Sequence, residues 1–127
     1  MTDVETLPTG TITFLRSDVE GSMRLVQELG SRFDEVNAQH QALVRSACAE
    51  YGGHEVRTEG DAFFVVFPDA HDAVRAAVAI QKSIAAHAWP AGVRLRVRIG
   101  LHAGSAYRAG DDYGGLEVSR AARIAAA

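Results

Sequence analysis

The chain has a single cysteine, Cys48, only three prolines and no long apolar segment in its 127 residues. One cysteine excludes an intramolecular disulfide and fits a reducing compartment. No run of about 18 apolar residues occurs, so the sequence predicts no membrane-spanning helix. Residues 1–9 are polar and acidic and lack the basic and apolar regions of a secretory signal peptide. We therefore expect a cytoplasmic protein without a membrane partner.

An excess of basic residues is also lacking. The 13 Lys and Arg residues are outnumbered by 16 Asp and Glu, which gives a net charge of −3. Proteins that bind a nucleic-acid backbone usually present a basic surface that neutralises phosphates. The composition therefore argues against nucleic acid as a partner. Any anion must be held by local charges, metal ions or backbone amides.

The remaining composition is that of an ordinary folded protein. Hydrophobic residues make up 47% and charged residues 23% of the chain. The length suits one domain with one core. We read residues 1–9 as a flexible leader and residues 10–127 as a single domain.

The first half of this domain begins with a strand and two helices. Residues 10–17 are β-branched and aromatic and predict a strand that closes at Asp18. Residues 19–22 form a turn into a helix that ends near Gly30. Apolar residues then recur at spacings of three and four over residues 33–51, which indicates an amphipathic helix.

A hairpin follows this helix. Residues 54–58 and 62–67 read as two strands joined by the tight turn at Glu59-Gly60-Asp61. The second strand, AFFVVF, is continuously apolar, as in a buried central strand.

The second half of the domain has a further helix and strand. Asp69 is placed to cap a helix whose apolar stripe we expect at the following positions: Ala70, Ala73, Val74, Ala77, Ile80 and Ile84. Residues 93–101 alternate strictly between apolar residues and arginine, which predicts a strand that continues in bent form over residues 102–108. A Gly/Asp loop at 109–115 and an alanine-rich helix at 117–127 complete the chain.

The predicted order of elements is β-α-α-β-β-α-β-β-α. This order indicates an α+β fold: a ferredoxin-like antiparallel sheet with helices packed on one face.

Two aspartates occupy corresponding places in this predicted sheet. Asp18 ends the first strand, and Asp61 lies at the tip of the hairpin. The first strand and the hairpin are neighbours in a ferredoxin-like sheet, so both carboxylates are expected at one rim. Two carboxylates with open coordination positions suit Mg²⁺ or Mn²⁺, which take substrate phosphates as further ligands. The alternative is structural, with Asp18 as a helix cap and Asp61 as a turn residue.

The turn after Asp18 is a candidate phosphate site. The backbone N–H groups of Val19, Glu20, Gly21 and Ser22 lie at a predicted helix N-terminus, which favours anions. Gly21 permits close approach to the backbone.

Four segments resemble the signatures of class III adenylyl and guanylyl cyclases, in the same order. They are TITFLRSDVEGSMRL, GGHEVRTEGDAFFVVF, LRVRIGLHAG and GDDYGGLEVSRAARIAAA. Together they cover about residues 10–127. The resemblance implies a cyclase homology domain.

The resemblance also assigns the metal and phosphate positions. It makes Asp18 and Asp61 the ligands of two Mg²⁺ or Mn²⁺ ions, with the carbonyl of Val19 assisting the second ion. Glu20, Gly21 and Ser22 fall in the substrate-binding turn. The implied reaction is attack of the ribose 3′-hydroxyl of ATP on the α-phosphorus, which gives 3′,5′-cyclic AMP and pyrophosphate.

Four other residues match positions that read the base or act in the transition state. Asp112 matches the residue that reads the adenine amino group, and Arg57 stands where adenine-specific enzymes have lysine. Arg123 matches the arginine that stabilises charge on the α-phosphate, and Ser119 stands where the family has a ribose-orienting asparagine. In the family these residues come from one subunit and the metal aspartates from the other, so the resemblance implies a head-to-tail homodimer.

The sequence departs from the family pattern at three places. Arg57 and Ser119 replace lysine and asparagine, and the family's later strands, with a lysine that grips the triphosphate, have no counterpart in these 127 residues, as in a fragment or a shortened relative. Arginine does not substitute freely for lysine, so GTP is also a candidate substrate. Ser119 and the missing strands favour a second interpretation. The alternative is a weak or silent cyclase-homology module that acts in dimerisation or nucleotide sensing within a signalling protein.

Overall fold

The computed structural model describes residues 10–109 and 112–114. The elements, in chain order, are β1 (Gly10–Val19), α1 (Ser22–Leu29), α2 (Arg32–Glu50), β2 (His54–Glu59), β3 (Ala62–Phe67), α3 (Ala70–Ala86), the short 3-10 helix η2 (Pro90–Gly92), β4 (Val97–Ala109) and β5 (Asp112–Gly114). The strands lie in the order β2-β3-β1-β4-β5. Every pairing is antiparallel, so the predicted α+β class is confirmed.

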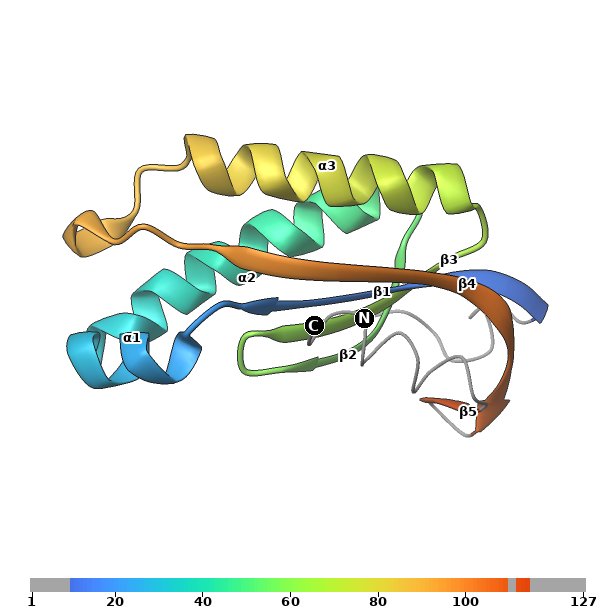
Figure 1. The fold of residues 1–127 in the computed structure, drawn as a ribbon, viewed down its shortest axis with the longest axis horizontal. Helices are drawn as coiled ribbons and strands as arrows, with labels where there is room; N and C mark the ends of the chain where they lie inside the picture. The colour runs from blue at the N-terminus through green and yellow to red at the C-terminus, as the bar shows by residue number, and fades with distance from the viewer. Residues whose placement is uncertain (1–9, 110–111, 115–127) are drawn as a thin grey trace.

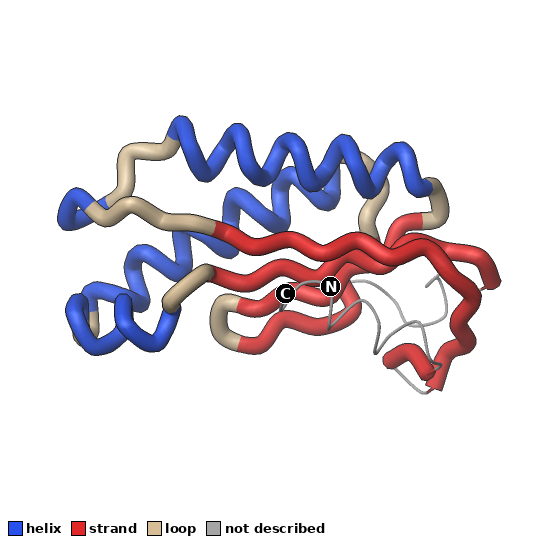
Figure 2. Tube along the Cα trace, viewed as in Figure 1, coloured by secondary structure: helices blue, strands red, loops and turns tan. Residues whose placement is uncertain are grey.

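The helices α2 and α3 cover one face of this sheet (Figures 1 and 2). Alternate residues of the strands point toward them, because successive side chains of a strand face opposite sides. The resulting core contains, from the strands, Leu15, Val19, Phe63, Val65, Phe67 and Val97. From the helices it contains Val36, Val44, Ala47, Cys48, Ala73, Ala76, Ile80 and Ile84. None of the described helices is long and apolar enough to cross a membrane.

The other face of the sheet carries a second buried group: Ile12, Phe14, Phe64 and Val66. The rings of Phe14 and Phe64 are stacked, with centroids 5.6 Å apart and planes 12° apart. Asp18 lies on this same face, because it is four residues beyond Phe14 in β1.

The helices match their predicted positions, with one correction. Asp69 caps α3, since its Oδ1 accepts a hydrogen bond of 2.7 Å from the backbone N–H of His71. The apolar stripe of α3 was predicted wrongly at three points: Ala70 and Val74 were expected to face the core and are exposed, and Ala76 was not expected to and is buried. The buried residues 73, 76, 80 and 84 form a narrow line along α3, and Val74 lies about 100° around the helix from Ala73.

The later strands differ from the prediction at their ends. β4 begins at Val97 rather than at residue 93, because residues 93–96 follow η2 as extended chain without strand pairing. The predicted alternation of apolar residues and arginines is nevertheless reflected in burial, since Leu95 and Val97 are buried and the arginines between and beside them are exposed. β4 runs unbroken to Ala109, and the predicted loop at 109–115 contains the short strand β5. The predicted leader 1–9 and helix 117–127 lie outside the described residues.

β2 forms one edge of the described sheet and contains a β-bulge. Glu55 is opposite Val65 and Arg57 is opposite Phe64, so the register shifts between Glu55 and Arg57. A bulge bends the strand and changes which face the following side chains take.

Candidate active site

The end of β1 is held against β4 by an ion pair. Asp18 and Arg98 are direct partners in the β1–β4 register. Arg98 donates from Nε to Asp18 Oδ1 and from Nη2 to Oδ2, both at 2.8 Å. This two-pronged geometry is the strong form of an arginine–carboxylate pair.

The hairpin turn brings Asp61 to the same place. Gly60 has a left-handed backbone, with φ of 58°, as the tight turn before Asp61 requires. Oδ2 of Asp61 then accepts a hydrogen bond of 2.8 Å from the backbone N–H of Val19, the residue after Asp18. The structure therefore places the two aspartates, 43 positions apart in the chain, at one rim of the sheet.

Negative charge is concentrated at this rim. The pKa of Arg98 is raised from its ordinary value, first by the hydrogen bonds and charge of Asp18 and further by the charges of Glu20 and Asp61. Two carboxylates beside a backbone carbonyl are the oxygen ligands that Mg²⁺ and Mn²⁺ take, so these residues fit a divalent cation. Within residues 11–105, no three His, Cys, Asp or Glu side chains gather into a metal-binding cluster.

Arg98 now occupies both oxygens of Asp18. A cation that binds Asp18 therefore competes with this guanidinium for the carboxylate.

The turn between β1 and α1 offers fewer amides for a phosphate than the sequence predicted. The N–H of Val19 donates to Asp61, and the N–H of Glu20 donates to the carbonyl of Arg96 at 2.8 Å. Of the four backbone amides predicted to bind a phosphate, those of Gly21 and Ser22 remain as candidates. Gly21 precedes α1 with φ of 67°, in the left-handed region. A groove of about 480 Å³ adjoins this turn and is lined by Glu20, Gly21, Arg24, Leu25, Arg94 and Arg96.

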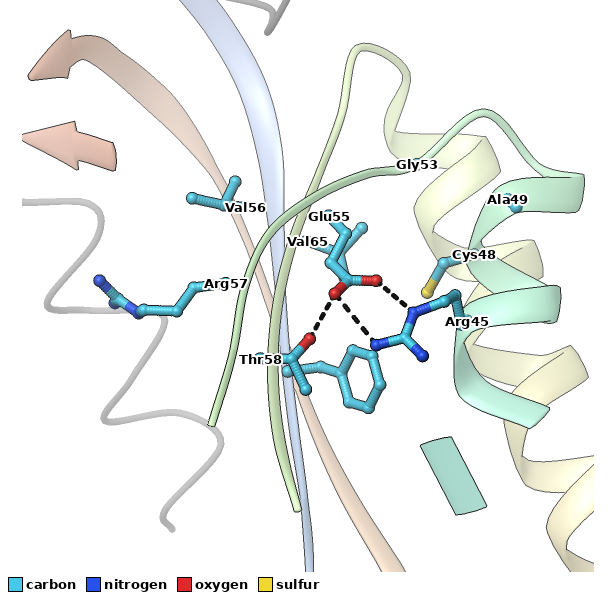
Figure 3. A pocket seen from close by; sticks show the side chains of 10 residues that line it. Arg45, Cys48, Ala49, Gly53, Glu55, Val56, Arg57, Thr58 and Val65 are labelled. Atoms are coloured by element: carbon cyan, nitrogen blue, oxygen red, sulfur yellow. Dashed lines mark hydrogen bonds and ion pairs between the residues drawn. The ribbon is translucent and has the colours of Figure 1, made fainter. Parts of the chain in front are cut away.

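Arg57, the predicted base-reading residue, lies on β2, with β3 between it and β1. It extends from β2 on the side away from α2 (Figure 3). Its guanidinium carbon lies 5.7 Å from the centre of the Phe64 ring, and its Nε lies 3.5 Å from Glu59 Oε1. Arg16 lies over the same ring at 5.0 Å, so two guanidiniums contact one aromatic ring.

The other predicted site residues are only partly described. The backbone of Asp112 pairs with Ala109 between β5 and β4. Ser119 and Arg123 lie outside the described residues.

A larger cavity of about 690 Å³ lies between α2 and β2 (Figure 3), and Asp18 is not among the residues that line it. The side chain of Arg45, on α2, donates to both oxygens of Glu55, on β2, at 2.7 and 3.2 Å. Thr58 Oγ1 donates to Glu55 Oε2 at 2.6 Å. These bonds, chiefly those from Arg45, lower the pKa of Glu55. Burial raises the pKa of Cys48, at the wall of this cavity, to about 12, so its thiol is un-ionised. Cys48 is a free, buried cysteine.

Sequence reasoning missed the support of Asp61 by α2. Asn37 and Gln41 both donate to the carbonyl of Gly60, and His40 is fully buried between them. The only signal in the sequence is the spacing: positions 37, 40 and 41 share one helix face, and all three are polar.

The comparisons with known proteins identify the family. The sequence matches the family of the adenylate and guanylate cyclase catalytic domain over residues 4–113. This chain therefore belongs to that family.

Particular relatives agree with this assignment. An uncharacterized protein of Mycobacterium tuberculosis is 35% identical over 96% of this chain, which spans 41% of that protein. An adenylate cyclase of Podospora anserina is 31% identical over 94% of this chain, which spans 7% of that enzyme. An adenylate cyclase structure from Trypanosoma brucei, described in its monomeric state, has a TM-score of 0.87 at 24% identity, covering 94% of this chain and 70% of that one. The last likeness concerns the fold alone.

Proposed function

We propose that this chain is the catalytic module of a cytoplasmic adenylyl cyclase, which converts ATP to 3′,5′-cyclic AMP and pyrophosphate with two Mg²⁺ or Mn²⁺ ions in a homodimer. The observation that carries the proposal is the hydrogen bond from the Val19 N–H to Asp61 Oδ2, which brings the second aspartate beside the first. A helix cap and a turn residue have no need to meet, so the structural alternative does not account for their convergence.

The chain's own residues have defined tasks in this reaction. Asp18, Asp61 and the carbonyl of Val19 would hold the cations. Bound cations would activate the ribose 3′-hydroxyl and stabilise the charge on the leaving pyrophosphate. The amides of Gly21 and Ser22 orient the phosphates at the start of α1.

The second set of residues completes the site from the partner subunit. Arg57 and Asp112 read the base, Ser119 orients the ribose, and Arg123 stabilises charge on the α-phosphate. These roles rest on the family resemblance. Because the aspartates and Arg123 serve different sites of one C₂ dimer, a monomer has no complete site.

A silent module remains the second candidate, and two observations favour it. Ser119 is shorter than the asparagine it replaces, and the loss of one aligned donor costs about 10²–10³ in rate. Arg98 also neutralises Asp18, so the rim is stable without a cation. Such a module would keep the dimer and lose the turnover.

One assay separates these functions. The purified chain is incubated with Mn²⁺ and ATP, and separately with GTP, and cyclic nucleotide is measured alongside the mass of the protein in solution. We expect cyclic AMP from ATP and a dimeric mass. Asp18→Asn and Asp61→Asn should each abolish the product while leaving the fold intact, since asparagine retains an acceptor oxygen.

Asp34→Asn is the matched control, because Asp34 is an exposed aspartate on α2 outside the rim. Its activity should equal that of the parent. A dimer that forms no cyclic nucleotide from either substrate would reject the proposed enzyme and favour the silent module. Product that survives both Asp18→Asn and Asp61→Asn would reject the metal site.

A further inference from the structure

Polar side chains of α2 hold the turn that carries Asp61. Gln41 donates from Nε2 to the carbonyl of Gly60 at 2.6 Å, and Asn37 donates from Nδ2 to the same oxygen at 3.1 Å. Gly60 is the left-handed residue directly before Asp61. Two donors on one carbonyl fix the orientation of the peptide that links Gly60 to Asp61.

His40 orients one of these donors. Its Nδ1 lies 3.1 Å from Asn37 Oδ1. Because the amide nitrogen of Asn37 donates to Gly60, its oxygen is an acceptor, so Nδ1 of His40 carries the hydrogen. The ring has no exposed surface and stands edge-on to Phe63, with centroids 6.0 Å apart. Its second nitrogen, Nε2, is buried without a hydrogen-bond partner, which suits a neutral ring.

Asp61 is also held at its far end, where Oδ2 accepts from Val19. The turn is therefore fixed at two points. The carbonyl before Asp61 is anchored to α2, and the carboxylate is anchored to β1. None of the α2 side chains is part of the proposed catalytic site.

We propose that Asn37, His40 and Gln41 are positioning residues that set the affinity of the rim for a divalent cation by fixing the peptide before Asp61. This inference rests on the proposed function, since it takes Asp61 as a metal ligand. Residues that orient metal ligands typically change metal affinity by about 10- to 100-fold when they are removed.

The test measures Mn²⁺ binding to the whole 127-residue chain, without nucleotide, by electron paramagnetic resonance of free Mn²⁺. Asn37→Ala and Gln41→Ala should each weaken binding, and the double variant should weaken it about tenfold. His40→Phe, which loses the bond to Asn37, should behave like Asn37→Ala. In the cyclase assay the apparent KM for Mn²⁺ should rise, while kcat at saturating Mn²⁺ stays at the parent value.

Gln39→Ala is the matched control. Gln39 lies two residues from Gln41 on the same helix, and its Oε1 lies 2.6 Å from Nε2 of His87, the residue that follows α3. Its removal should leave the Mn²⁺ affinity unchanged. Equal weakening by Gln39→Ala and Gln41→Ala would show a general effect of α2 and overturn the inference.

The two hypotheses fail in different ways. A parent chain that binds no Mn²⁺ and makes no cyclic nucleotide rejects the proposed function. A parent chain that binds Mn²⁺ and loses it in Asp61→Asn, while the Asn37→Ala/Gln41→Ala double variant binds as the parent does, rejects the positioning role alone.

Discussion

Arg98 and Asp18 face each other across β4 and β1, and the guanidinium donates to both carboxylate oxygens at 2.8 Å. The arginine therefore neutralises one of the two carboxylates that the family resemblance assigns to metal binding. The guanidinium and a divalent cation are both positive and bind the same carboxylate, so they compete for Asp18.

The first prediction concerns this competition. Arg98→Ala should bind Mn²⁺ several-fold more tightly than the parent in the absence of nucleotide, because no guanidinium competes for the Asp18 carboxylate. The variant should also gain more thermal stability from added Mg²⁺, since a ligand that binds only the folded state stabilises it. Both effects are measured by Mn²⁺ titration and thermal unfolding.

Arg94→Ala provides the control for this experiment. Arg94 is an exposed arginine of the same segment, so its removal changes the net charge equally without touching Asp18. An equal gain in Mn²⁺ affinity in Arg94→Ala and Arg98→Ala would show that the effect comes from the change in net charge alone.

The second prediction concerns the pH dependence of stability through His40. Burial lowers the pKa of His40 below its ordinary value, partly opposed by the charge of Asp61. In the unfolded chain the imidazole titrates near 6.5, so below that pH the unfolded state binds more protons. The titration of His40 therefore leaves the free energy of unfolding unchanged above about pH 6.5. As the pH falls from there toward the native pKa of His40, this free energy decreases by at most about 1.4 kcal/mol per pH unit.

Urea unfolding at pH 7 and pH 5.5 measures this dependence. His40→Phe should lose less free energy of unfolding between the two pH values than the parent loses. His71→Ala, which removes an exposed histidine of α3, should retain the parent's slope. A parent slope that persists in His40→Phe would show that another group is responsible.

The third prediction concerns the close packing at Gly53. A Cβ at this position would lie 2.7 Å from Cζ of Phe67 and 2.9 Å from Cγ1 of Val65. Both neighbours are fully buried side chains of β3. Gly53→Ala should therefore lower the free energy of unfolding by about 1–3 kcal/mol, the usual cost of overpacking.

A double-mutant cycle checks the cause. Phe67→Leu shortens the side chain that the new methyl group meets. In the Phe67→Leu background, Gly53→Ala should cost less than in the parent. Equal costs in both backgrounds would mean that the clash with Phe67 is not the source of the loss.

The fourth prediction concerns Cys48. With a pKa of about 12, its thiol forms almost no thiolate at pH 8. The folded chain should therefore react with a disulfide reagent at least about 100-fold more slowly than the urea-unfolded chain. Fast reaction of the folded chain would contradict the buried, un-ionised state of this residue.

Much of the fold was readable from local patterns. The turn at Gly60, the apolar run of β3 and the cap at Asp69 each depend on neighbouring residues, and the structure confirms them. The stripe of α3 was harder, because alanines dominate that helix and periodicity alone does not show which line of alanines faces the sheet. Val74 was assigned inward for that reason and is exposed.

The site was harder to predict in its details. The sequence places Asp18 at the end of one predicted strand and Asp61 at the tip of the neighbouring hairpin. It does not give the register between the strands. That register decides that Arg98, rather than Arg94 or Arg96, is the partner of Asp18. The contacts of Asn37 and Gln41 with Gly60 likewise depend on how α2 packs over the hairpin.

The bulge between Glu55 and Arg57 also affects how the edge of the sheet can pair with other molecules. β2 is an outer strand of the described sheet, and outer strands are where separate molecules can join by backbone pairing. A strand that is bent and carries Glu55, Arg57 and Glu59 is a poor template for such pairing. We therefore expect the irregular strand to disfavour association through this edge, and deletion of Val56, the residue at the bulge, should make the chain more prone to aggregate.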